Sequence, residues 1–177
     1  MMKNAFKTTA ILLIALAMLF ACKKKTEDPM DFTVDDQNLT ACPLGTTCHF
    51  QYANNASMDG NWLNTTVGQH RIFWARNAGK YTTSWMYFQA PMAGDKFLLN
   101  DADVQAGKVK FVSGCPTCFG IELKALKGTV KGIKVAKNNA EPEKWLLESK
   151  IVLSAIGSSD VPFDTIYVKQ YYYPSIQ

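Results

Sequence analysis

The sequence predicts an all-β fold, an antiparallel β-sandwich with a β-barrel as the alternative and at most one short helical turn. Several stretches alternate apolar and polar residues with period two, and turn-forming residues separate them. No stretch longer than about two turns carries a helical period, which excludes folds built from alternating strands and helices. Hydrophobic residues make up 47% of the 177, enough for one sizeable core.

The first predicted strand lies over 48–52, where Cys48, Phe50 and Tyr52 alternate with less apolar neighbours. Residues 71–76 and 81–89 are rich in β-formers, and the loop 77–80 between them contains a glycine that can adopt a positive φ. These two segments therefore predict a β-hairpin.

A helical turn is predicted over 100–107, begun by Asn100 or Asp101 and ended by Gly107. Asp101 and Asp103 are explained by this cap, because the spacing of a calcium loop is absent. The segment 144–155 is predicted to be a strand, because apolar residues occupy odd-numbered positions along it. These residues are Trp145, Leu147, Ile151 and Leu153. The other strands are predicted over 96–99, 108–113, 121–126, 129–136 and 164–173.

The amino-terminal segment has the pattern of an export signal. Lys3 and Lys7 precede an apolar run of about 12 residues, shorter than the roughly 20 needed to span a bilayer. The run ends at Leu19-Phe20-Ala21-Cys22, which resembles the lipobox of bacterial lipoproteins, with Phe20 where that pattern prefers a small residue. The resemblance implies cleavage before Cys22, a diacylglycerol thioether on Cys22 and an acylated amino terminus.

The expected organisation is a lipoprotein signal peptide over 1–21, a flexible charged tether over 22–41 and a single β domain over 42–177. The expected location is the cell envelope, with the outer membrane of a Gram-negative bacterium favoured. An ordinary secretory signal, leaving Cys22 as a free thiol, is the alternative. Removing Lys3 and Lys7 from 19 basic residues leaves 17 against 15 acids, a charge of +2 that predicts no nucleic-acid partner.

Four further cysteines, Cys42, Cys48, Cys115 and Cys118, predict two disulfides in an oxidising compartment. Three pairings are possible. The local pairs, Cys42 with Cys48 and Cys115 with Cys118, are favoured because each is close in sequence and a proline follows its first cysteine. A cross-pairing of the two segments is the alternative.

The spacing of Cys115 and Cys118 is that of a thioredoxin-type redox pair, but a strand is predicted after it where a helix would be needed. A structural disulfide is therefore preferred, and a thiol-disulfide redox accessory remains the alternative function. A zinc site on the four cysteines is disfavoured by oxidation, and no cofactor is expected. Cys48 and His49 point to opposite faces of a strand, so no catalytic residues are predicted.

Aromatic residues suggest a non-catalytic binding or structural domain that recognises a glycan or another envelope protein. Trp74 and Trp85 lie in the predicted hairpin and are expected in the core, whereas Trp62 lies in a polar loop and is the candidate ligand-binding residue. Lysines on the later strands could form a patch for anionic lipid or polysaccharide, although solvated strand faces are the preferred explanation. They are Lys108, Lys110, Lys124, Lys127, Lys131, Lys134 and Lys137.

Overall fold

The computed structural model describes residues 30–59, 64–115, 120–135, 143–158 and 160–175. It confirms the all-β prediction, with one sheet of nine strands that is not closed into a barrel and one short helix. The chain divides into two units, Met1–Asp31 and Phe32–Gln177. The second unit contains all of these strands.

The strands and the helix are β1 (Thr47–Met58), β2 (Thr65–Val67), β3 (His70–Ala78), β4 (Thr83–Pro91), β5 (Lys96–Leu99), α2 (Asp101–Gln105), β6 (Val109–Gly114), β7 (Leu123–Val135), β8 (Lys144–Ala155) and β9 (Pro162–Pro174). Their order agrees with the prediction except at two places: the strands predicted over 121–126 and 129–136 are a single strand, β7, and the short strand β2 was not predicted. None of the helical residues described forms a segment with the length and hydropathy to cross a bilayer.

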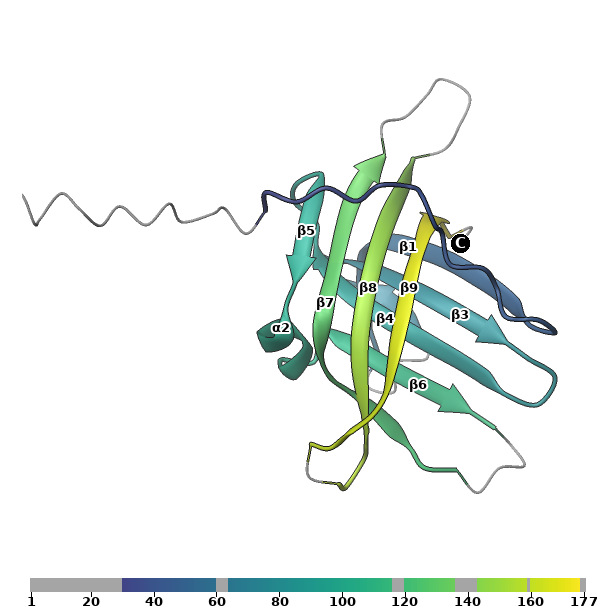
Figure 1. Cartoon of the computed structure of the whole chain (residues 1–177). Helices are drawn as coiled ribbons and strands as arrows, with labels where there is room; N and C mark the ends of the chain where they lie inside the picture. The colour runs from purple at the N-terminus through teal and green to yellow at the C-terminus, as the bar shows by residue number, and fades with distance from the viewer. Residues whose placement is uncertain (1–29, 60–63, 116–119, 136–142, 159, 176–177) are drawn as a thin grey trace, which may run out of the picture. The chain divides into compact units, whose positions relative to one another are not determined.

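The strand order is β5-β7-β8-β9-β1-β3-β4-β6. β2 pairs with the last residues of β1, from Ala56 to Met58. The pairings are antiparallel except that of β1 with β9, which is parallel and joins only Gln51 to Tyr173 and Tyr52 to Pro174. The half containing β7, β8 and β9 lies across the half containing β1, β3, β4 and β6 (Figure 1). The two halves therefore face each other as the layers of a sandwich do, although this short pairing makes them one sheet.

The main core fills the space between these halves, and aromatic rings form its centre. The ring of Phe73 on β3 lies 5.3 Å from Phe97, 5.6 Å from Trp145 and 5.7 Å from Tyr172. Such edge and offset contacts add to the stabilisation from apolar burial. The predicted apolar parity of β8 is confirmed, because all four of its members are buried in this cluster.

The predicted hairpin is also confirmed. β3 and β4 are paired along their whole length, with His70 opposite Pro91 at one end and Ala78 opposite Thr83 at the other. The expectation that its tryptophans enter the core is wrong. Successive side chains on a strand point to opposite faces, so Phe73 faces inward and Trp74 faces outward. Trp74 and Trp85 pack on a second cluster, on the face of β3 and β4 turned away from the main core.

The predicted helical turn is α2, and its cap explains the acidic residues. The side chain of Asn100 accepts hydrogen bonds from the backbone N–H groups of Ala102 and Asp103, while the Asp103 carboxylate accepts one from the Asn100 N–H. This reciprocal pair is a capping box. Asp101 accepts a hydrogen bond from the Gly128 N–H at 2.7 Å, which attaches the helix to β7.

The compact unit begins at Phe32, whereas composition predicts folded residues only from Cys42. The segment 32–41 crosses the β7-β8-β9 half (Figure 1). Lys169 on β9 donates to Asp35 at 2.6 Å, and the Thr40 N–H donates to the Lys169 carbonyl at 2.8 Å. The predicted signal peptide, Cys22 and the tether up to residue 29 lie outside the described residues.

Candidate functional site

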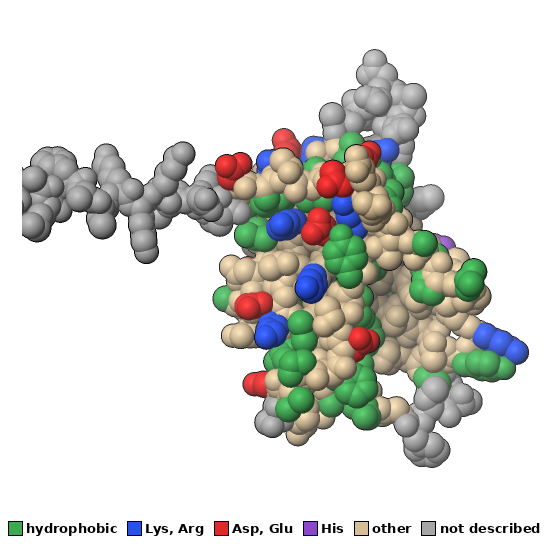
Figure 2. Space-filling model, viewed as in Figure 1, with side chains coloured by type: hydrophobic (Ala, Val, Ile, Leu, Met, Phe, Trp, Pro, Cys, Tyr) green, Lys and Arg blue, Asp and Glu red, His purple; other side chains and the backbone are tan. Residues whose placement is uncertain are grey.

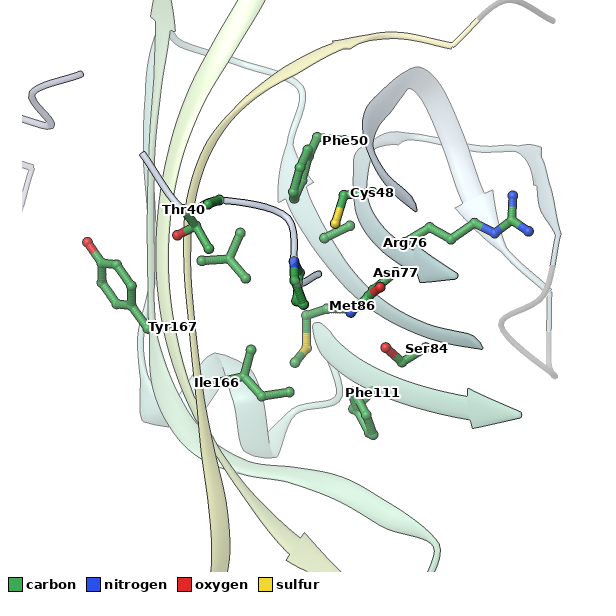
Figure 3. Close-up of a pocket in the computed structure, with 14 residues that line it drawn as sticks. Thr40, Cys48, Phe50, Arg76, Asn77, Ser84, Met86, Phe111, Ile166 and Tyr167 are labelled. Carbon is green, nitrogen blue, oxygen red and sulfur yellow. The ribbon is translucent and has the colours of Figure 1, made fainter. Parts of the chain in front are cut away.

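A cavity of about 260 Å³ lies between β9 and the inner face of the β1-β3-β4-β6 half (Figure 3). Ile166 and Val168 form the β9 wall, and Phe50, Met86 and Phe111 form the opposite wall. The segment from Thr40 to Pro43 borders the cavity as well. With Ala75 and Asn77 on β3, six separate parts of the chain thus contribute to this one cavity.

The cavity exists because β1 and β9 separate after their short pairing. Within the described residues, β1 before Gln51 and β9 before Tyr173 are not paired with each other. Thr40 takes the place of β1 beside β9, since its N–H donates to the Lys169 carbonyl and its hydroxyl accepts from the Lys169 N–H. The inner faces of the two halves are therefore apart at this point, and the cavity lies between them.

The cavity lining is mostly apolar. Among the described residues that line it, none is aspartate, glutamate or histidine. Figure 3 shows the side chains of Arg76 and Tyr167 directed away from the cavity. The arrangement can hold an apolar group.

Two polar side chains interrupt this lining where Asn77 on β3 is paired with Ser84 on β4. The Oδ1 atom of Asn77 is buried and has no hydrogen-bond partner within the described part of the chain. A buried carbonyl oxygen without a partner is unfavourable by about 1–3 kcal/mol, so a bound O–H or N–H group at this position would be stabilised.

The predicted Cys42–Cys48 disulfide is present, with the two Cα atoms 5.7 Å apart. It ties the cavity-lining segment that contains Pro43 to β1, and Cys48 itself lines the cavity. Cys115 is also disulfide-bonded. Cys118, its predicted partner, lies outside the described residues. Sulfur atoms held in a disulfide are not available as thiolate ligands, which argues against the alternative zinc site.

The two histidines do not meet the cysteines in a catalytic arrangement. His49 is exposed on β1, and the alternation of the strand directs it away from Cys48. His70 starts β3 opposite Ala56, and its buried Nδ1 has no hydrogen-bond partner within the described ranges. The described residues contain no group of three or more histidine, cysteine or acidic side chains placed to hold a metal.

Trp62, the predicted ligand-binding residue, lies outside the described residues. Several of the lysines considered as a patch are paired with acids, and basic and acidic side chains are interspersed on the face shown in Figure 2. Lys108 contacts Asp103 at 2.6 Å, Lys134 contacts Glu143 at 2.9 Å, and Lys124 contacts Asp160 at 3.6 Å. Sequence reasoning missed the cavity, because its walls come from distant segments whose individual residues are ordinary strand residues.

The chain matches no protein-family model, and comparisons with curated proteins and with solved structures find no similar protein. The functional interpretation therefore depends on the geometry and on the amino-terminal sequence.

Proposed function

We propose that the protein is a lipid-anchored lipoprotein of the cell envelope whose β domain binds, without catalysis, an apolar group in the cavity between β9 and the facing half-sheet. The cavity is the observation that carries the binding proposal. The anchor is supported by the lipobox-like sequence that ends at Cys22. The outer membrane of a Gram-negative bacterium is the proposed location.

The chemistry of the walls supports an apolar or amphipathic ligand. An apolar cavity of about 150 Å³ already accommodates a benzene ring, so a space of about 260 Å³ can hold a larger hydrocarbon group. A sugar placed there would leave most of its hydroxyl groups without partners, which is strongly unfavourable. The Asn77 oxygen and the Ser84 hydroxyl are two side-chain groups that would orient a donor on the ligand.

Filling the cavity provides the test. Ala75 lies on the inner face of β3 and lines the cavity. An Ala75→Leu substitution should lower the affinity for the neutral fluorophore N-phenyl-1-naphthylamine by at least about tenfold, because the added methyl groups occupy the ligand's space. Binding is measured by the rise in probe fluorescence. The thermal midpoint should stay equal or rise, since the new side chain buries apolar surface.

The matched control is Ala102→Leu, the identical substitution at an exposed position on α2 that does not line the cavity. This variant should bind the probe as the unmodified protein does. Failure of the unmodified protein to bind the probe, or equal binding by the Ala75→Leu variant, would reject the cavity as the binding site.

The anchor is tested separately in the producing cell. Mass spectrometry of the amino-terminal peptide should show Cys22 as the first residue, carrying acyl mass. A Cys22→Ser variant should leave the membrane fraction, because attachment depends on the acyl chains. An unmodified Cys22 would reject the anchor without affecting the cavity result.

A further inference from the structure

The outer face of the β1-β3-β4-β6 half carries an aromatic surface that is separate from the cavity. Ile72 and Tyr87 are buried on this face, and Trp74 and Trp85 pack against the cluster that they form. Both indoles are partly exposed. An aromatic ring in this position contacts buried side chains and still presents surface to a ligand, as in a stacking platform.

The strand register arranges this surface in two rows across four strands. One row contains Gln51, Trp74, Tyr87 and Lys110, and the next contains His49, Arg76, Trp85 and Val112. Residues directly opposite each other have Cβ atoms about 4.5–5.5 Å apart, so aromatic, amide and basic groups are close neighbours. We call these eight residues the aromatic face.

The charge of the aromatic face favours an acidic ligand. Arg76 is exposed, and its guanidinium lies 5.9 Å from the Trp85 ring centroid. No salt bridge joins Arg76 to a carboxylate in the part of the chain that is described. The eight positions include no acid. Burial is the main cause that raises the pKa of Tyr87 to about 12, and the negative charge of the nearby Asp59 is the second cause.

We infer that the aromatic face binds an acidic polysaccharide, with sugar rings stacked on Trp74 and Trp85 and a carboxylate paired with Arg76. A guanidinium donates two parallel hydrogen bonds to a carboxylate, and the indole surfaces match the C–H groups of a pyranose ring. Gln51 and His49 supply further hydrogen-bonding groups in the same rows. Arg76 also borders the cavity, but its side chain is directed away from it (Figure 3), so this site stands independently of the proposed function.

Affinity electrophoresis in gels that contain a dissolved polysaccharide tests the inference. The protein is the chain from residue 22 with Cys22→Ser, which retains the whole compact unit. The probes are two polyuronates, alginate and polygalacturonate, with neutral dextran for comparison. At least one polyuronate should retard the protein, with an affinity at least about tenfold higher than that for dextran. Equal affinity for dextran, or no retardation by either polyuronate, would overturn the inference.

Variants assign the binding to specific residues. Trp74→Ala and Arg76→Gln should each weaken polyuronate binding by about tenfold, as expected for central aromatic and arginine contacts. The Gln51→Glu substitution places a negative charge beside Trp74 without removing a packed ring, and should weaken binding in the same way. It keeps the test decisive if Trp74→Ala impairs folding, which circular dichroism and thermal melting report.

Two control variants lie outside the aromatic face. Tyr81 is 64% exposed in the β3–β4 loop, and Lys150 is exposed on β8. Tyr81→Ala and Lys150→Gln should leave polyuronate binding unchanged. Losses in these controls equal to those of the face variants would show general adhesion to basic and aromatic surface, and would overturn the assignment.

Discussion

Arg71 is a buried cation that no carboxylate pairs with among the described residues. Its Nε donates to the Asn54 side chain at 2.7 Å and its Nη2 donates to the Met92 carbonyl at 3.3 Å. The guanidinium lies 4.2 Å from the Trp145 ring centroid, while its buried Nη1 has no hydrogen-bond partner among the residues that the structure describes. Burial lowers the pKa of Arg71. Hydrogen bonds and the indole thus compensate only part of the loss of hydration.

Replacing Arg71 should reveal what stabilises this position. Arg71→Lys should lower the free energy of unfolding by about 1–3 kcal/mol, because a single ammonium nitrogen lacks the planar fork with which Nε and Nη2 reach two separate acceptors. Arg71→Met should lower it less, since it keeps the packed stem and buries no charge. Urea unfolding followed by tryptophan fluorescence measures both. A methionine variant less stable than the lysine variant would show that the charge itself is stabilising.

The pair of Asp35 and Lys169 makes attachment of the segment 32–41 depend on pH. The hydrogen bond from Lys169 lowers the pKa of Asp35, and the same bond raises the pKa of Lys169. A lowered carboxyl pKa stabilises the fold above its ordinary value of about 3.9, and the effect is lost as the pH falls through the lowered value. A raised ammonium pKa stabilises the fold below about 10.4, and the effect is lost as the pH rises through the raised value.

Asp35→Asn should therefore lower the thermal midpoint at pH 7, and the difference from the unmodified protein should vanish in strong acid. Hydrogen exchange at the Thr40 amide, which donates to Lys169, should become faster in this variant at pH 7. Asp36→Asn is the matched control, because an amide oxygen can still accept the hydrogen bond from the Tyr171 hydroxyl. A pH-independent effect of Asp35→Asn would contradict the ion pair.

At the scale of elements, the pairing of β5 with β7 requires a glycine. Gly132 is paired with Phe97, and a Cβ atom on Gly132 would overlap the Phe97 ring. That ring cannot move freely, since it is stacked on Phe73 and also contacts Trp145. Gly132→Ala should lower the free energy of unfolding by about 1–3 kcal/mol, as overpacked core substitutions do.

Gly120→Ala is the comparison for this substitution, because nothing lies within 4 Å of a Cβ at that exposed position. Its effect should stay within about 0.5 kcal/mol in the same urea experiment. Similar losses for the two variants would show that glycine flexibility, and not the Phe97 contact, determines the result.

The elements could be predicted because their signals are local. The alternation in β8 identifies its buried parity, and the glycine-containing loop identifies the β3–β4 hairpin. The environment of Trp74 and Trp85 could not be predicted in this way, because a strand with apolar residues on both faces does not show which face meets the core. The second cluster makes both faces of β3 apolar.

At the scale of the whole molecule, the sequence predicts the fold class but not the strand order or the cavity. The parallel contact of β1 with β9 joins segments far apart in the chain, and no local pattern indicates which strands become neighbours. The cavity depends on that contact, because it lies where the two strands separate. The local disulfide was predictable from spacing, whereas the role of Thr40 beside β9 required the three-dimensional structure.

The two-residue junction between β1 and β9 also has a consequence for folding. β1 is the first and β9 the last of the described strands, so one edge of β1 has no neighbour until β9 has folded against it. Contacts between such distant segments form slowly, because a long loop must close first. A chain that ends before Tyr173 would lack the β1–β9 pairing that joins its two half-sheets. Such a product would be prone to aggregation.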